Sequence, residues 1–258
     1  MSIPLFYSRK WVWPEPITES WIYWSSDLGL ISLSSNWITW ITITDKNLWA
    51  TTVYNDWDTL SEANCGKYYQ WWNNYWFPFT WSVTTSSTQV DASSYWPWNY
   101  YSSSTFITRS STTSSRSSVR NDNLWGWVTW TNEAMQWPCA SWYHIPKDTE
   151  RKDVYNIWVS LWLSNWSRSR WGWLKTYLKI PFAGRRDASS SSVDYQGSDA
   201  NYWSSITYDA SRAYELTANT LAFSPNSANR NPDGNSIRPF ANEPVQPTVE
   251  RTVLYQPS

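Results

Sequence analysis

The sequence contains few glycines, few cysteines, one histidine and no excess of either charge. It has seven Gly in 258 residues, where an average composition would give about 18. Its two Cys exclude a disulfide-dense scaffold and a four-cysteine zinc site. The 20 Lys and Arg and the 21 Asp and Glu give a net charge of −1. This balance lacks the basic excess of proteins that bind nucleic acid, so we expect no nucleic-acid partner.

Long apolar runs are also missing. No stretch reaches the roughly 18 apolar residues needed to cross a bilayer, so we expect no membrane span. The first ten residues lack the apolar core of a signal peptide. A single unit of this length could still bury a large core.

Tryptophan is abundant, with 25 residues, and several stand where turns favour glycine. Trp72, Trp76, Trp137 and Trp142 are the clearest cases, because they adjoin Asn, Pro and Ser in turn-like contexts. Some bacterial lineages decode UGA as glycine, and a standard translation of such a gene prints tryptophan. We interpret these positions as recoded UGA codons. The alternatives are an aromatic surface that stacks on sugars or cations, and tryptophans that fill a core.

The hydrophobic pattern indicates an α+β fold. Alternation of β-branched and polar residues predicts strands within 28–43. From residue 180 onward the sequence is typical of strands and turns, with candidate strands at 200–205, 213–218, 221–223 and 235–240. Apolar residues at i, i+3, i+4 and i+7 predict a helix over 148–163. The Ser- and Thr-rich stretch 82–119 is typical of long surface loops.

Six short elements resemble those of one bacterial family. They are WPCASWYHIP at 137–146, KIPFAGRRD at 179–187, YWSS at 202–205, SIR at 236–238, and the earlier pair DKNL at 45–48 and YQW at 69–71. As an ordered set they resemble the bacterial "major paralogous" (FISUMP-type) domain. Trp72 and Trp142 stand where the family pattern has Gly, which agrees with the recoding interpretation.

The resemblance implies a C-type-lectin-like fold of the formylglycine-generating-enzyme branch, loop-rich, with a small antiparallel or mixed sheet and one or two helices. We divide the chain into an N-terminal strand-forming segment (1–36), the C-type-lectin-like domain (37–240) and a Pro-containing linker or start of a following module (241–258). The resemblance also implies a bacterial protein located outside the cell or on its surface.

Members of this wider fold include the variable proteins of diversity-generating retroelements, whose binding residues lie beside the closing strands. Residues 206–235 are rich in Asn, as such segments are, although a polar hairpin would look the same. The candidate ligand-binding residues are Ile206, Tyr208, Asp209, Arg212, Glu215, Thr217, Asn219, Asn226, Asn229, Asn231 and Asn235.

Alternation along 213–218 assigns these residues to two faces. Tyr214, Leu216 and Ala218 would pack on the core, while Ala213, Glu215 and Thr217 would face the solvent. Tyr and Arg supply most interface energy, so Tyr208 and Arg212 are the expected centres of binding. We therefore predict a non-enzymatic protein that binds an unknown protein or glycan. The alternative is a carbohydrate-binding adhesin with aromatic platforms.

Sequence features that would support catalysis are weak. His144 is the single histidine, and its place before a helix indicates a buried, hydrogen-bonded residue. Cys65 and Cys139 could form a disulfide or remain buried thiols. The closing segment has no Cys for a formylglycine-generating activity, so we expect no enzyme and no cofactor. Calcium held by loops such as 54–58 stays an open alternative.

Overall fold

Small antiparallel sheets, one long helix and extended loops make up this α+β chain. The computed structural model describes residues 21–25, 29–35, 38–95, 99–109, 117–119, 125, 138–140, 142–163, 172–209, 211–230 and 233–242. Its helices and helical turns are α1 (Glu62–Cys65), η1 (Ala92–Ser94), α2 (Asp148–Leu163) and η3 (Trp173–Tyr177). Its strands are β1 (Trp21–Ser25), β2 (Leu30–Ser35), β3 (Ile38–Thr44), β4 (Tyr69–Gln70), β5 (Thr85–Ser86), β6 (Val90–Asp91), β7 (Phe106–Ile107), β8 (Ser117–Val119), β9 (Tyr143–His144), β10 (Arg185–Arg186), β11 (Val193–Asp194), β12 (Ala200–Thr207), β13 (Arg212–Ala218), β14 (Phe223–Arg230), β15 (Gly234–Asn235) and β16 (Phe240–Ala241).

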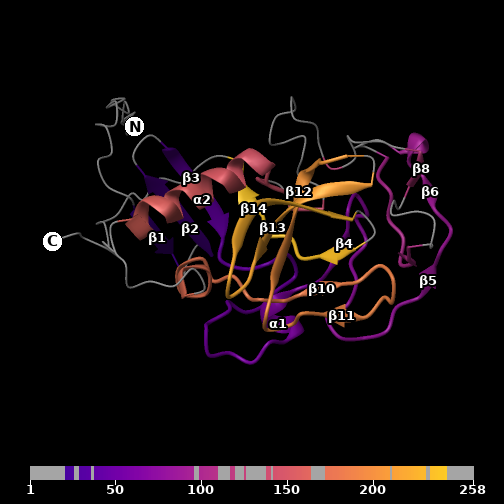
Figure 1. Ribbon diagram of the computed structural model, residues 1–258, viewed down its shortest axis with the longest axis horizontal. Coiled ribbons are helices and arrows are strands. Elements are labelled where there is room, and N and C mark those ends of the chain that lie inside the picture. Colours follow the sequence, from indigo (N-terminus) through magenta and orange to yellow (C-terminus); the bar gives the residue numbers. More distant parts are fainter. Residues whose placement is uncertain are drawn as a thin grey trace, which may run out of the picture.

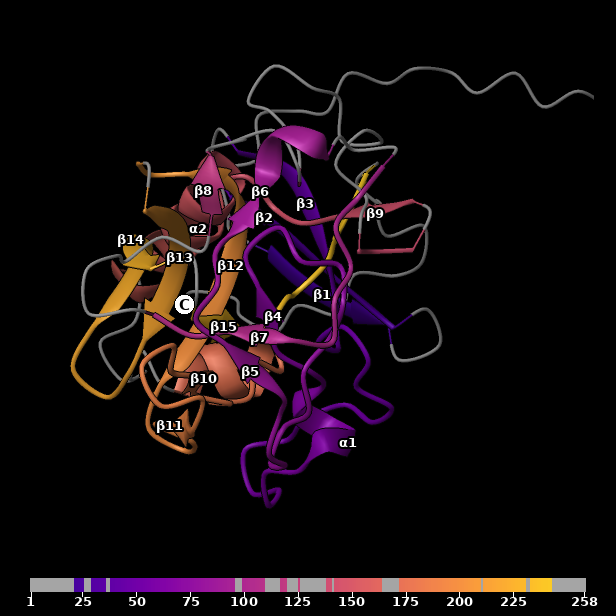
Figure 2. The ribbon, with the colours of Figure 1, turned by 90° about the vertical axis from the view of Figure 1, so that its right-hand side faces the viewer.

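Three sheets organise the molecule. The first has the order β1-β2-β3-β16-β9, in which Phe240 pairs with both Ile43 and His144. The second is the antiparallel sheet β12-β13-β14, and the third has the order β11-β10-β15-β4. The first sheet thus joins strands near both ends of the described chain. The parallel pairs β5–β7 and β6–β8 lie together on one side of the molecule, which faces the viewer in Figure 2.

Helix α2 covers strands of the first and second sheets (Figure 1). Val154 and Ile157 of its apolar face are buried in one cluster with Leu216 and Phe223 of the second sheet. The prediction of a helix over 148–163 is confirmed, because its i, i+3 spacing places these side chains on the face that packs. No helix in the described ranges has the length and apolar character that crossing a membrane requires.

Four of the six sequence elements that carry the family resemblance, at 45–48, 179–187, 202–205 and 236–238, are joined by buried hydrogen bonds. The hydroxyl of Tyr202 donates to the carbonyl of Pro181 (2.9 Å) and accepts from Asn47 Nδ2 (3.0 Å). Arg238 Nε donates to Asn47 Oδ1 (3.0 Å), and its Nη2 donates to the carbonyl of Lys179 (2.7 Å). Buried polar groups are costly unless they are paired, so these elements hold one another in place.

Three tryptophans adopt backbone conformations that favour glycine. Trp49, Trp72 and Trp142 have φ of 68°, 58° and 73°. In this left-handed region the β-carbon crowds the following carbonyl, at a cost of about 1–2 kcal/mol per residue. The interpretation of Trp72 and Trp142 as glycine-type positions therefore has backbone support. Trp76 is not among the positive-φ residues, and Trp137 lies outside the described residues.

Candidate functional site

A partly exposed group of side chains lies where β12 turns into β13. The amides of Tyr208 and Asp209 donate to the carbonyl of Arg212 (2.9 and 3.1 Å), which closes the turn. Asp209 Oδ1 accepts from the amide of Ser211 (2.9 Å), and Asp209 Oδ2 accepts from Arg212 Nε (2.7 Å). An Asp side chain that binds the backbone two residues ahead is a common way to fix a turn. The turn therefore has a defined geometry.

The rings of Tyr208 and Tyr214 and the guanidinium of Arg212 are in contact. The Arg212 guanidinium lies 4.4 Å from the centroid of the Tyr208 ring, and Tyr214 meets that ring edge-on at 5.2 Å. Tyr208 is 48% exposed. The hydrogen bond from Arg212 lowers the pKa of Asp209 to about 2, so this ion pair persists at neutral pH. We call Tyr208, Asp209, Arg212 and Tyr214 the tyrosine–arginine cluster.

The expectation that Ala213 and Glu215 face the solvent is wrong. Ala213 is fully buried and Glu215 is 5% exposed, while Thr217 is half-buried. On the other face Leu216 and Ala218 join the core as expected, whereas Tyr214 is half-buried and its ring contacts that of Tyr208. The face of Ala213 and Glu215 is covered because Asn229 of β14 and Asn235 of β15 bind the Glu215 carboxylate, while Ala213 packs in one cluster with Trp203 and Ile237. This long-range packing has no signature in a local alternation pattern.

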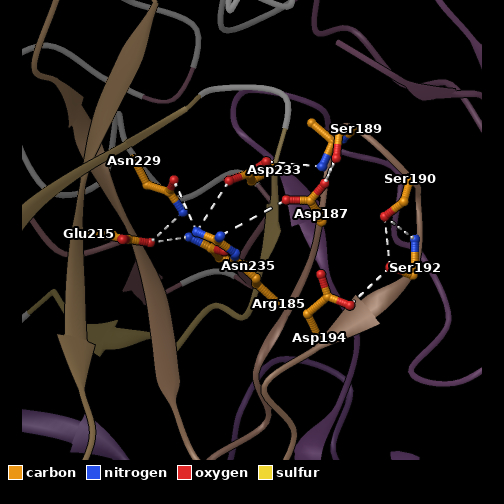
Figure 3. A network of polar contacts seen from close by, with 11 residues as sticks. Arg185, Asp187, Ser189, Ser190, Ser192, Asp194, Glu215, Asn229, Asp233 and Asn235 are labelled. Carbon is orange, nitrogen blue, oxygen red and sulfur yellow. Dashed lines mark hydrogen bonds and ion pairs between the residues drawn. The ribbon is translucent and has the colours of Figure 1, made fainter.

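Glu215 is the centre of a buried polar network (Figure 3). Its Oε2 accepts from Asn229 Nδ2 (3.0 Å) and from Asn235 Nδ2 (2.6 Å). Its Oε1 accepts from the hydroxyl of Thr217 (2.9 Å). Burial raises the pKa of the Glu215 carboxyl above its ordinary value, against these hydrogen bonds. Asn229 and Asn235 are also buried. These three residues therefore stabilise the packing of the strands and are not available to contact a ligand at the surface.

Arg185 links this network to the surface. Its Nη1 lies 3.4 Å from Asn229 Oδ1 and 3.5 Å from Asp233 Oδ2, and its Nη2 lies 3.9 Å from Asp187 Oδ2. In Figure 3 the Arg185 side chain reaches toward both carboxylates. The guanidinium lies 5.5 Å from the centroid of the half-exposed Tyr195 ring. We call Arg185, Glu215, Asn229, Asp233 and Asn235 the buried polar network.

Sequence reasoning missed Arg185 and Asp233 as members of this network. Arg185 lies in the PFAGRR element that carries the family resemblance, which was the available signal. Asp233 precedes Gly234, and its Oδ1 accepts from the amide of Ala188 (3.0 Å). No pattern in a single sequence indicates that partner.

The remaining candidate residues lie apart from both groups. Asn219 Oδ1 accepts from the amides of Leu221 and Ala222 (both 2.9 Å), so this side chain shapes the β13–β14 turn. Ile206 is half-buried. Asn226 is half-buried near the start of α2, and Asn231 lies outside the described residues.

The histidine and the cysteines lie inside the molecule. His144 is fully buried, with Nδ1 3.0 Å from Asn242 Oδ1 and Nε2 3.0 Å from Glu150 Oε1, which confirms the interpretation of a hydrogen-bonded residue before α2. Cys65 and Cys139 are buried free thiols. In the portion of the chain that the structure describes, no group of three or more His, Cys, Asp or Glu could hold a metal ion.

Comparison of the chain with family models, with curated proteins and with solved structures finds no match. The family resemblance therefore stays a prediction from the sequence elements.

Proposed function

We propose that this chain is a non-enzymatic ligand-binding protein that presents the tyrosine–arginine cluster on a C-type-lectin-like scaffold of the FISUMP type. The ligand is a protein or a glycan at a surface outside the cell. The observation that carries this proposal is the contrast between Tyr208, which is 48% exposed, and Glu215 of the adjoining strand β13, which is 5% exposed and belongs to the buried polar network.

The chemistry of the cluster suits recognition. Tyr and Arg are enriched among the residues that dominate binding energy, because they combine apolar area with hydrogen-bonding groups. Tyr208 and Arg212 present a ring and a guanidinium side by side. Asp209 holds the guanidinium in place before any ligand arrives. Such ordering reduces the entropy that is lost on binding.

The position of the cluster suits variation. Substitutions at exposed sites usually change stability by less than about 0.5 kcal/mol. The buried polar network behind the turn would keep the strands in register while exposed residues change. This separation supports a role as a variable protein of a diversity-generating retroelement. The proposed variable surface is narrower than residues 206–235, because it excludes Glu215, Asn229 and Asn235.

A comparison of sibling genes from the same genome, together with the sequence of a neighbouring template repeat, tests the variable-protein proposal. We expect adenine-directed changes to concentrate at Tyr208, Asp209, Arg212 and Tyr214 and to spare Glu215. An even spread of changes over buried and exposed positions would contradict the proposal.

A glycan array tests the ligand class and the alternative adhesin. The full chain is compared with Tyr208→Ala, Arg212→Ala and the control Tyr100→Ala, since Tyr100 is 42% exposed and lies outside the cluster. Glycan binding that only the two cluster variants lose supports a glycan ligand at this site. Binding that Tyr100→Ala weakens equally, or that neither cluster variant weakens, would place recognition elsewhere.

A further inference from the structure

Two groups of tryptophans in the described part of the chain differ in backbone conformation. Trp71, Trp125 and Trp203 form the first group, and each is at most 1% exposed. Their indole N–H groups donate to Ser204 O (2.9 Å), Asn74 Oδ1 (2.8 Å) and Tyr69 O (2.6 Å). None of the three is among the positive-φ residues. A large buried ring with a satisfied N–H is what tryptophan in a protein core requires.

The second group consists of Trp49, Trp72 and Trp142, which have φ between 58° and 73°. A bulky side chain is a genuine outlier in this region, and Trp has no short polar group to bond the local backbone as Asn and Asp do. Trp49 and Trp142 are 59% and 76% exposed, so packing of their rings does not compensate for the backbone conformation.

The glycines of the same chain show which residue type normally adopts a positive φ. Gly29, Gly66, Gly184 and Gly197 have φ between 65° and 82°. The values at Trp49 and Trp142 lie inside that interval, and the value at Trp72 lies just below it. Among the described residues, six non-glycine residues have positive φ, and three of them are Trp. This share is higher than the share of Trp in the whole sequence, which is 25 of 258 residues.

We propose that the polypeptide made in its own organism carries glycine at positions 49, 72 and 142, because the codon there is UGA and the host reads it as glycine. The proposal joins the composition, with 25 Trp and seven Gly, to the backbone geometry at named positions. It does not depend on the proposed function. It extends the sequence-based interpretation to Trp49 and leaves out Trp76, whose φ is not positive.

The proposal has a consequence for ligand recognition. The exposed rings of Trp49 and Trp142 would be absent from the native surface. An aromatic platform built from them would then not exist, and aromatic contacts would come from residues such as Tyr208, which is exposed and is a tyrosine in either genetic code.

Two measurements test the assignment, and neither requires a variant to fold. The first is the nucleotide sequence, in which we expect TGA at 49, 72 and 142 and TGG at the control positions 71, 125 and 203. TGG at the first three positions would overturn the proposal. The second is peptide mass spectrometry of the protein isolated from its own organism. We expect the mass of glycine at 49, 72 and 142 and of tryptophan at the controls. Tryptophan at all six positions would overturn the proposal even if TGA is present.

Discussion

Glu215 offers the sharpest test of the buried polar network, because two variants of this residue separate its hydrogen bonds from its charge. Glu215→Ala removes the acceptor of Asn229 Nδ2 and Asn235 Nδ2, which are 3.0 and 2.6 Å from its Oε2. Each buried donor that loses its partner costs about 1–3 kcal/mol. Removal of a partly compensated buried carboxylate offsets part of this cost. We expect Glu215→Ala to lower the free energy of unfolding by about 3 kcal/mol.

Glu215→Gln keeps the same shape and can bond the same three partners, with the direction of the hydrogen bond to Thr217 reversed. Its amide oxygen can accept from both Asn side chains, and its amide nitrogen can donate to the Thr217 hydroxyl, which turns to accept. We expect this variant to lose less than about 1 kcal/mol. Thr220→Ala, at an exposed position of the β13–β14 turn, is the control and should stay within about 0.5 kcal/mol.

Urea unfolding followed by circular dichroism measures all three variants at neutral pH. The reasoning is refuted if Glu215→Ala unfolds at the same urea concentration as Thr220→Ala. It is also refuted if Glu215→Gln is as damaging as Glu215→Ala, because charge rather than hydrogen bonding would then hold the network.

The remaining predictions concern titration and reactivity. Because burial raises the pKa of Glu215, its contribution to stability is present below its unfolded pKa, about 4.3, and declines as the pH rises. Urea unfolding should therefore show wild type losing stability relative to Glu215→Gln between pH 4 and 7, and the opposite trend would contradict burial as the dominant cause. Arg212→Ala should move the pKa of Asp209 from about 2 toward its ordinary value in an NMR titration, and an unchanged pKa would exclude the ion pair. Burial raises the pKa of Cys65 to about 12 and also raises that of Cys139, so neither thiol should react with Ellman's reagent until guanidinium unfolds the chain. A disulfide between them in the oxidised protein would disprove the free-thiol state.

Local patterns in the sequence predict the parts of the fold that depend on local contacts. The helix over 148–163 follows from its apolar spacing, and one face of strand β13 follows from alternation, whereas residues 200–205 of β12 are all buried and do not alternate. This face of β13 is the core face, since Leu216 and Ala218 are buried against α2. In each case the periodicity of one element determines which side chains meet the core.

The other face of β13 could not be predicted in this way. Its cover comes from residues far along the chain or on other elements, including Asn235 beside Glu215 and Arg185 of β10. A polar residue at an alternating position looks solvent-facing until a second layer buries it. The proposed site therefore narrows from residues 206–235 to the turn at Tyr208–Arg212, and the role of this turn in binding stays a prediction.

The central claim is that the tyrosine–arginine cluster binds the ligand, whereas the buried polar network holds the surrounding strands in place. A saturation library at Tyr208, Arg212, Glu215, Asn229 and Asn235, displayed on yeast and sorted for protease resistance, tests this claim without knowledge of the ligand. The account predicts that most substitutions at Tyr208 and Arg212 remain resistant, whereas most at Glu215, Asn229 and Asn235 become sensitive. Equal tolerance at all five positions, or greater sensitivity at Tyr208 and Arg212, would contradict it.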